Sequence, residues 1–515
     1  MSAHWNPFNR LFRKPSQEGQ QHGPQTKRAI ARLIIPAKTE THPGAVYKKG
    51  ETIGKQYEVL GVLGIGGFSV VYLVYSHENQ QAYALKTLRD TFLRDEETRA
   101  QFRKEARLWI HLERHPYIVT ATFIEELGGR IYIGMEYIAP NEAGLNSLEG
   151  YLTRRSPDLA QSLRWGVQFC QGMEYAHERG IRCHRDVKPA NIMITQEGIV
   201  KITDFGFADV LDVSRARGRF EALGRRRRMS DDDQSGFGTP AYMPPEQFRN
   251  AARCDERSDI YSFGVVLYQM ASRGRLPFPE ALSAARAQSA GRMWKDMHRL
   301  HTEASIPTLA SPLFPIIKKC MQKEPSKRYQ TFHELRTELD ELMLRVTGET
   351  IAPHHTEELE AWELYNKAFS LASLGHLEEA IVTYDRVLAL EPQNTNAWNS
   401  KGVCLKKQGK IQDALGCYEK AIECDRHNAS AWNNKGSLLA TMGKHTEAIV
   451  QFNKAIEVDP ANESAWLSRA MAEDRLGLRH EAAQSYQKFI DLKPSQLEAH
   501  LTHARKRVEE LKRRK

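Results

Sequence analysis

The chain has 515 residues, of which 41% are hydrophobic, and its formal net charge at pH 7 is +9. This length and apolar content supply more than one packed core and exclude a single small domain. No run of 18 or more apolar residues occurs, which argues against a membrane-spanning helix, and the N-terminus lacks the apolar core of a secretory signal.

Three segments account for the positive charge. Residues 1–50 carry nine basic and two acidic side chains, residues 214–228 carry seven and one, and residues 499–515 carry seven and two. Separated basic segments without a base-reading motif are more often solvated tails than nucleic-acid surfaces, so we expect no nucleic-acid partner. We expect residues 1–50 to be a disordered tail. Seven cysteines without a C-x-x-C pair predict free thiols in a reducing compartment and a cytoplasmic protein.

The first structured elements surround a glycine cluster. Residues 57–63 and 70–75 have the alternating, β-branched composition of strands, and Gly64, Gly66 and Gly67 lie between them. In a dinucleotide-binding turn the glycines would open a helix, whereas here they lead into a second strand. A glycine hairpin of this kind lets backbone N–H groups approach phosphates, because no Cβ atom blocks them.

A single lysine ends the next apolar strand, residues 83–86. Lys86 would be buried among apolar neighbours, so its ammonium needs anionic partners. The charged stretch 95–112 has a helical pattern, and Glu105 within it is the candidate partner.

The motif that indicates chemistry most clearly is His184-Arg185-Asp186. It is followed by Lys188 and Asn191 and then by Asp204-Phe205-Gly206. Phosphoryl transfer needs one carboxylate to orient an attacking hydroxyl, and a second carboxylate with an amide oxygen to hold Mg²⁺. Asp186, Asp204 and Asn191 supply these groups in the required order.

Together these motifs resemble the protein kinase family over residues 57–346. The resemblance implies a two-lobed α+β fold, with Met135-Glu136-Tyr137-Ile138 as the hinge whose backbone binds adenine. It implies ATP and Mg²⁺ (or Mn²⁺) as cofactors, Asp186 and Lys188 as catalytic residues, and Asn191 and Asp204 as metal ligands. The implied ATP-binding residues are Leu63, Gly64, Ile65, Gly66, Gly67, Phe68, Ser69, Val70, Val71, Lys86, Glu136 and Ile138.

Further along the chain, residues 238–246 resemble the segment that closes the activation loop. Within it Thr239 would contact the acceptor peptide and Glu246 would pair with Arg328, while Asp259 would brace the catalytic loop. The sequence departs from the family pattern at two places: Pro244 replaces the usual alanine, and Ser69 replaces the third glycine. Neither departure removes a charged or catalytic group.

The kind of acceptor is indicated by Lys188, because kinases specific for tyrosine usually lack a lysine there. The resemblance therefore implies transfer to serine or threonine, and Thr239 supports this. In the family, the arginine at Arg185 typically pairs with a phosphorylated residue of the activation loop. Ser235 is the candidate for autophosphorylation, and Ser230, which follows four arginines, is the alternative.

Three other interpretations stay open. A pseudokinase would keep the fold but lose the lysine or one of the aspartates, and Lys86, Asp186 and Asp204 are all present. A small-molecule kinase normally lacks the segment corresponding to residues 238–246. The whole protein could also act mainly as a scaffold.

The C-terminal part repeats with a period of 34 residues. The repeated residues are Gly375, Gly409, Gly443 and Gly477; Ala380, Ala414, Ala448 and Ala482; Tyr384, Tyr418, Phe452 and Tyr486; Trp398, Trp432 and Trp466; and Pro392, Pro460 and Pro494, with Arg426 in the remaining proline position.

This repeat resembles the tetratricopeptide repeat, an all-α solenoid in which each unit is a helix–turn–helix. Glycine and alanine would permit close helix crossing, and the tryptophans would belong to the core. The predicted units are 363–396, 397–430, 431–464 and 465–498, after a linker at 347–362 and before a basic capping helix or tail at 499–515. Candidate residues of a ligand groove are Asn399, Lys406, Asn433, Asn434 and Arg469.

The sequence thus predicts a serine/threonine protein kinase whose repeats recruit a peptide or protein, either a substrate or a regulator. The combination of a kinase with such repeats is similar to prokaryotic kinases.

Overall fold

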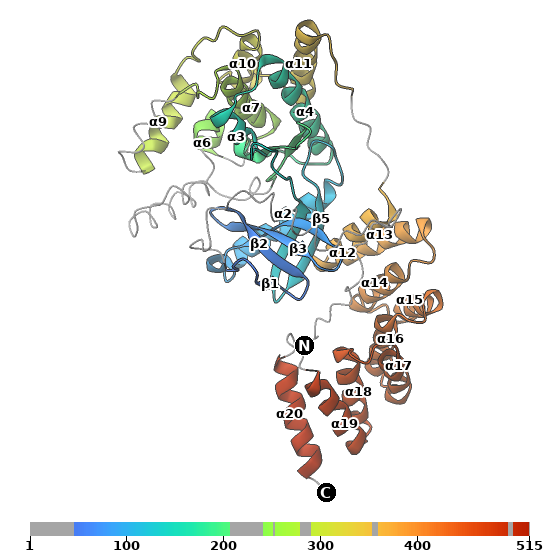
Figure 1. Cartoon of the computed structure of the whole chain (residues 1–515). Helices are drawn as coiled ribbons and strands as arrows, with labels where there is room; N and C mark the ends of the chain where they lie inside the picture. The colour runs from blue at the N-terminus through green and yellow to red at the C-terminus, as the bar shows by residue number, and fades with distance from the viewer. Residues whose placement is uncertain are drawn as a thin grey trace. The chain divides into compact units, whose positions relative to one another are not determined.

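The computed structural model describes residues 46–205, 240–250, 253–278, 290–352, 359–492 and 498–513. These residues form two compact units that separate between Glu358 and Leu359 (Figure 1). Several predicted features lie outside the described residues: most of the 1–50 tail, Gly206, Ser230, Ser235 and Thr239.

The first unit begins with a six-stranded antiparallel sheet in the order β1-β2-β3-β4-β6-β5, the N-terminal lobe. One helix of this lobe, α2 (Glu96–His111), packs against β5. The strands are β1 (Thr52–Ile53), β2 (Tyr57–Ile65), β3 (Ser69–Ser76), β4 (Gln81–Leu88), β5 (Ala121–Leu127) and β6 (Arg130–Glu136).

Strand register decides which side chains share a face of this sheet. Lys86 lies opposite Val71 on β3 and Ile133 on β6, so these three side chains point to the same face. Because successive side chains alternate, Val70 lies on the opposite face, across from Thr87.

A glycine in β6 makes room for the aromatic packing on this sheet. Gly134 lies directly opposite Phe123, and a Cβ atom at Gly134 would lie 2.2 Å from the Phe123 ring. Phe123 is fully buried, stacks on Tyr57 at 5.7 Å and meets Tyr83 edge-on at 5.2 Å.

We expect Gly134→Ala to destabilise the N-terminal lobe by about 1–3 kcal/mol, because the new methyl group would force the Phe123 ring out of its stack. Thermal unfolding of the full chain would measure this effect on the transition that Mg·ATP shifts upward. The control is Gly61→Ala on β2, because Gly61 has no atom within 4 Å of a hypothetical Cβ and no positive φ. An unchanged Tm in Gly134→Ala would show that the ring adjusts freely.

The rest of the first unit, the C-terminal lobe, is mainly helical, with a small two-stranded ribbon of β7 and β8. Helix α4 contacts α7, α11 and β8, and side-chain caps begin α4 (Asp158) and α11 (Thr331). The elements are α3 (Leu148–Arg154), α4 (Leu159–Glu178), η2 (Pro189–Asn191), β7 (Ile192–Ile194), β8 (Val200–Ile202), η4 (Pro240–Tyr242), α6 (Pro245–Arg249), α7 (Glu256–Ala271), α9 (Ala290–Glu303), α10 (Phe314–Cys320), η6 (Pro325–Lys327) and α11 (Phe332–Thr347).

The chain after α11 stays attached to the first unit. Glu349 accepts two hydrogen bonds from Arg164 on α4, at 3.0 and 2.7 Å, and Gln171 on α4 donates to the Ala352 carbonyl at 3.3 Å. The segment predicted as a linker, residues 347–362, therefore begins within the first unit, and a truncation after Ala352 keeps these contacts.

The second unit consists of consecutive antiparallel helix pairs followed by one more helix (Figure 1). The expected helix–turn–helix units are present. The helices are α12 (Ala361–Ser373), α13 (Leu377–Leu390), α14 (Thr395–Lys407), α15 (Ile411–Cys424), α16 (Ala429–Thr441), α17 (His445–Val458), α18 (Glu463–Arg475), α19 (Arg479–Asp491) and α20 (Glu498–Arg513). Helix α20 buries Ala504 and Val508 against the last pair.

The repeated glycines act differently from our expectation. Gly375, Gly409, Gly443 and Gly477 all have φ between +74° and +88° in the turn that joins each pair, a conformation that glycine adopts without strain. Close helix crossing is instead permitted by Gly402 and Gly436, where a Cβ atom would lie 2.7 Å from Tyr418 and Phe452 respectively.

The repeated tryptophans are half-buried, and Trp398 and Trp466 pack against the buried cores of their repeats. Each indole Nε1–H donates at 2.9 Å to the carbonyl six residues earlier, and for Trp432 that carbonyl belongs to Arg426. The arginine therefore replaces the usual proline without loss of this hydrogen bond. An asparagine cap at Asn394, Asn428 and Asn462 begins each first helix of repeats two to four.

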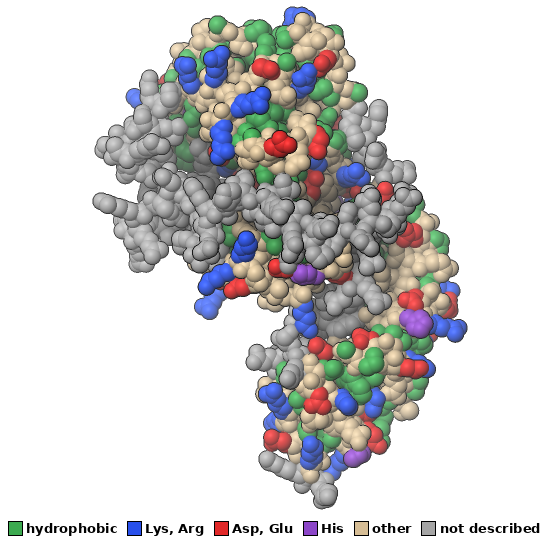
Figure 2. All heavy atoms as spheres, viewed as in Figure 1, with side chains coloured by type: hydrophobic (Ala, Val, Ile, Leu, Met, Phe, Trp, Pro, Cys, Tyr) green, Lys and Arg blue, Asp and Glu red, His purple; other side chains and the backbone are tan. Residues whose placement is uncertain are grey.

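Two surface properties bear on possible partners. Among the helices that the structure describes, none is both long and apolar enough to cross a membrane. On the face shown in Figure 2, the described Lys and Arg side chains are interspersed with Asp and Glu and do not gather in one patch.

Candidate active site

Lys86, on the strand face described above, meets two carboxylates. Its Nζ atom lies 2.6 Å from Glu105 Oε1 on α2 and 2.7 Å from Asp204 Oδ1. Burial alone would lower the pKa of Lys86, but Asp204 and Glu105 outweigh it and hold the pKa above its ordinary value. The structure thus brings together three residues that are up to 118 positions apart, with the lysine charged.

Asp186 lies at the centre of a second cluster. Its Oδ2 atom is 2.8 Å from Lys188 Nζ and accepts a hydrogen bond from Asn191 Nδ2 at 2.9 Å. Burial alone would lower the pKa of Lys188, but Asp186 raises it above its ordinary value, so this lysine is also charged. The ion pair and the amide N–H fix the position of the Asp186 side chain.

A residue of α7 forms hydrogen bonds to the backbone that precedes Asp186. Asp259 accepts the N–H groups of His184 at 2.6 Å and Arg185 at 2.8 Å. Arg185 and Asp204 have φ values of 62° and 63°, which non-glycine residues seldom adopt. These two hydrogen bonds stabilise the strained backbone at Arg185.

The glycine hairpin joins β2 and β3, and the Gly66 N–H closes it by donating to the Ser69 carbonyl at 2.8 Å. Gly64 and Gly66 have no atom within 3.4 Å of a hypothetical Cβ. The predicted set contains two side chains that the structure directs elsewhere: Phe68 is buried against Phe92 at 4.9 Å, and Val70 is fully buried on the face opposite Lys86. At these positions only the backbone can contact a nucleotide.

In the hinge, the side chain of Glu136 is also turned away from a nucleotide. It pairs with Lys201 at 2.7 Å, and the carbonyl of Ile138 accepts a hydrogen bond from Asn146 at 2.9 Å. These contacts occupy the Glu136 side chain and the Ile138 carbonyl, so other backbone groups of the hinge would have to contact adenine.

The residues present fit a nucleotide with a divalent cation. Asn191 donates through its amide nitrogen to Asp186, which leaves its amide oxygen for a cation. Burial alone would raise the pKa of Asp204, but Lys86 holds it below its ordinary value, so this second ligand is ionised. Carboxylate and amide oxygens are the ligands that Mg²⁺ prefers, and Lys86 would neutralise phosphates.

Glu246 and Arg328 form a buried ion pair in the C-terminal lobe. Arg328 donates to Glu246 Oε1 at 2.7 Å and to Oε2 at 2.9 Å, and the arginine side chain is 0% exposed. The pair joins α6 to the residue that follows η6. Pro244 lies just before α6 as its N-terminal cap.

One set of contacts at the site was not predicted from the sequence. The Phe205 ring is buried between Trp109 on α2, at 5.7 Å, and His184, at 4.8 Å. A signal for Trp109 was present, because it follows Glu105 by four residues and so lies on the same face of α2. Trp109 thus links the position of α2 to that of the Asp204 backbone.

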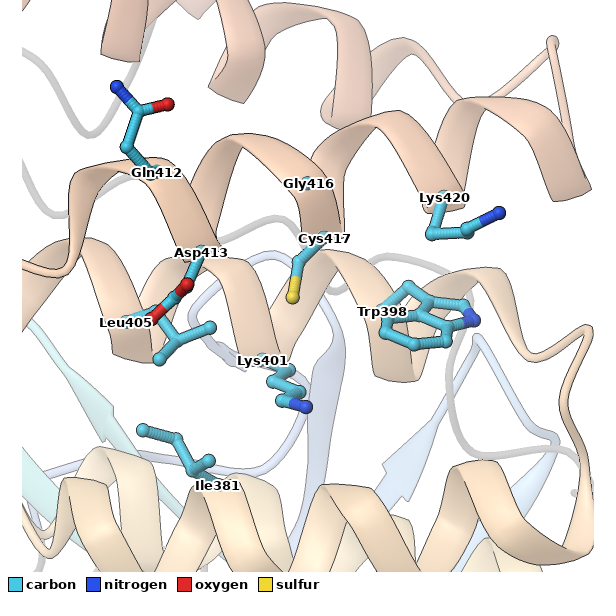
Figure 3. Close-up of a pocket in the computed structure, with 9 residues that line it drawn as sticks. All are labelled: Ile381, Trp398, Lys401, Leu405, Gln412, Asp413, Gly416, Cys417 and Lys420. Carbon is cyan, nitrogen blue, oxygen red and sulfur yellow. The ribbon is translucent and has the colours of Figure 1, made fainter.

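The second unit has a pocket of its own, of about 510 Å³, between α13, α14 and α15 (Figure 3). Ile381, Leu405, Trp398 and Cys417 form its apolar wall, and Gly416 opens it. In the neighbouring repeats, the position of Gly416 is occupied by the exposed residues Val382 and Val450.

Of the predicted groove residues, Asn399 and Asn433 are only 4% and 3% exposed. Asn434 donates to Asn399, and Arg469 pairs with Glu473.

The fold and the clusters around Lys86 and Asp186 can now be compared with known proteins. The family model described as the protein kinase domain matches residues 57–338, which is more than half of the chain. The chain belongs to the protein kinase family. Models of the tetratricopeptide repeat match residues 364–394, 395–428, 429–462 and 463–496. The predicted fold class, a two-lobed kinase fold followed by a tetratricopeptide-repeat solenoid, is therefore confirmed.

The kinase part is similar to bacterial serine/threonine kinases. It is 32% identical over 300 residues to a probable serine/threonine-protein kinase of Clostridium perfringens, covering 57% of this chain and 39% of that protein. It is 32% identical over 292 residues to PknB of Mycobacterium tuberculosis (56% and 43%) and 30% identical over 298 residues to PrkC of Bacillus subtilis (56% and 41%). The chain thus spans about two-fifths of the length of each of these relatives.

Proposed function

We propose that this protein is a serine/threonine protein kinase that transfers the γ-phosphate of ATP to protein hydroxyls with the help of Mg²⁺. The observation that carries the proposal is the pairing of Lys86 with both Glu105 and Asp204, at 2.6 and 2.7 Å, beside an Asp186 that contacts Lys188 and Asn191. A pseudokinase would not need this complete charged set. The similarity to named serine/threonine kinases supports the same function.

Each residue has a role that follows from its contacts. Bound Mg·ATP supplies the phosphoryl group together with part of the charge neutralisation. Asp186 orients the acceptor hydroxyl and takes its proton, and Lys188 stabilises negative charge beside it. Lys86 positions the nucleotide phosphates, and Asp204 and Asn191 hold the cation. Almost all of this work is positioning and electrostatics.

The repeats are proposed to recruit a protein substrate or regulator. Stacked helix pairs present extended surfaces for peptides and helices, and the pocket beside Gly416 gives this solenoid an apolar recess.

The test is transfer of labelled γ-phosphate from Mg·ATP by the full-length protein, followed by phosphoamino acid analysis. We expect label on serine or threonine and a loss of at least about 100-fold in Asp204→Asn, since the amide lacks the charge that holds the cation. Asp491→Asn, the same chemical change at an exposed residue of α19, is the matched control and is expected to be fully active. Absence of label in a folded wild-type protein that binds ATP would favour the scaffold interpretation.

Two extensions of the same assay address the remaining proposals. A truncation after Ala352 would reveal a recruiting role for the repeats if it lowers the labelling of captured partners but not that of a generic peptide. We also propose Ser235, with Ser230 as the alternative, as the site of autophosphorylation, because they lie between Asp204 and Glu246 in the sequence. Unchanged activity and labelling after replacement of both serines by alanine would refute this.

A further inference from the structure

A lysine outside the predicted site connects the hinge to the strand that leads to Asp204. Lys201, on β8, places its Nζ atom 2.7 Å from Glu136 Oε1. The Lys201 and Glu136 side chains are only 14% and 32% exposed, so water screens their attraction less than at the surface. Lys201 also reaches the Ile118 carbonyl at 3.4 Å.

The same glutamate oxygen bonds a third element, the loop of residues 117–120 before β5. Glu136 Oε1 accepts the Thr120 N–H at 2.8 Å, and the Glu136 N–H donates to the Thr120 carbonyl at 3.0 Å. On its other side this loop pairs with β8, through Ile202 N–H to the Tyr117 carbonyl and Val119 N–H to the Ile202 carbonyl, both at 2.8 Å. The loop is therefore fixed between the hinge and β8.

The other end of this network is the proposed metal site. Lys201 pairs in register with Met193 on β7, which begins directly after Asn191. The Thr203 N–H donates to the Asn191 carbonyl at 3.0 Å, and Asp204 is the next residue. The β7–β8 ribbon that Lys201 joins to the hinge thus carries both proposed metal ligands.

We propose that Lys201 is a positioning residue for nucleotide binding. Its ammonium, by bonding the Glu136 carboxylate, fixes the distance between the hinge that binds adenine and the ribbon that carries Asn191 and Asp204. A ligand that contacts both ends then binds to a site that is already assembled, and no affinity is lost to ordering it. This inference rests on the proposed function only in assuming that adenine binds the hinge and the cation binds Asp204.

Two ligands distinguish this positioning role from a purely structural one. Mg·ADP spans the two ends, so its affinity depends on their separation, whereas adenosine contacts the hinge alone. Loss of the ion pair should therefore weaken Mg·ADP and leave adenosine unaffected. A lysine that only stabilised the fold would affect the two ligands alike.

The experiment is calorimetric titration of the full-length protein with Mg·ADP and with adenosine, neither of which requires catalysis. We expect Lys201→Met to weaken Mg·ADP by about tenfold, the usual size for a hydrogen bond between charged groups, with adenosine within about twofold of wild type. Lys201→Arg should recover most of the affinity. Glu136→Gln should resemble Lys201→Met, and the double variant should be no weaker than either single variant.

The control is Lys327→Met, which breaks an exposed pair with Glu324 (61% and 63% exposed) in the same lobe and should leave both affinities unchanged. Equal Mg·ADP affinity in Lys201→Met and wild type, or a parallel loss for adenosine, would overturn the proposal. Should Lys201→Met fail to fold, Glu136→Gln gives the same comparison. A wild-type protein that binds Mg·ADP but transfers no phosphate would contradict the proposed kinase activity and leave this test intact.

Discussion

Asp186→Asn is expected to lower the rate of phosphate transfer by about 10²–10⁴-fold, the range found when a positioned general base is removed. An amide has the size of the carboxylate but cannot accept the hydroxyl proton, and it removes the anion that Lys188 and Asn191 contact at 2.8 and 2.9 Å. Lys86, Glu105 and Asp204 keep their mutual contacts, so the affinity for Mg·ATP should stay close to that of wild type.

Single-turnover transfer at saturating ATP, with ATP affinity measured separately, distinguishes these two effects. The exposed Asp491→Asn variant is again the matched control, because it makes the same change on α19 in the other unit. A wild-type rate at saturating ATP, with a loss of rate only at lower ATP concentrations, would mean that Asp186 serves binding and not proton transfer.

The chemistry of the site could be predicted from the sequence because its residues belong to short motifs with fixed spacing. Asp186, Lys188 and Asn191 lie within six residues. The ion pairs of Lys86 could be expected because an apolar strand ends in this one charged residue. A buried ammonium requires an anion, and Glu105 was the acidic residue of the nearest helical pattern that the family resemblance matched. These inferences depend on local spacing and on the cost of burying a charge.

The Lys201–Glu136 pair could not be predicted in this way. The two residues are 65 positions apart, neither is chemically unusual for a strand, and their meeting depends on the register of β6, the 117–120 loop and β8. Val70 shows the same limit: the alternation of a strand is visible in the sequence, but which of Val70 and Val71 shares the face of Lys86 is decided by pairing with β4.

In the repeats, the period identified the glycines but not their physical role. A recurring glycine serves either close packing or a positive φ, and only the backbone angles assign Gly409 to the second role and Gly402 to the first. The expectation that the tryptophans belong to the core did not include the indole N–H, which needs a partner and finds it in a carbonyl near the surface.

Arg328→Met is expected to destabilise the kinase unit by about 3–5 kcal/mol, the usual cost of removing one partner of a buried ion pair. Arg328 is fully buried and donates to both oxygens of Glu246. It also donates to the carbonyls of Gln322, Arg257 and Lys323, at 2.7, 2.9 and 3.1 Å. Methionine fills the space but removes the donor of all these hydrogen bonds, while the carboxylate keeps the Ser258 hydroxyl at 2.7 Å.

Calorimetric unfolding of the full chain would measure this loss in the transition that Mg·ATP stabilises, with Lys327→Met, one residue away at the surface, expected to change stability by less than about 0.5 kcal/mol. The double variant Arg328→Met with Glu246→Leu separates two explanations. If most of the loss comes from an uncompensated charge, removing Glu246 as well should recover a large part of it, since replacing both members of a buried pair is often close to neutral. If the double variant is instead as unstable as Arg328→Met, the three carbonyls would account for the loss, and Arg328 would act mainly as a backbone clamp between α7 and the residues that follow α10.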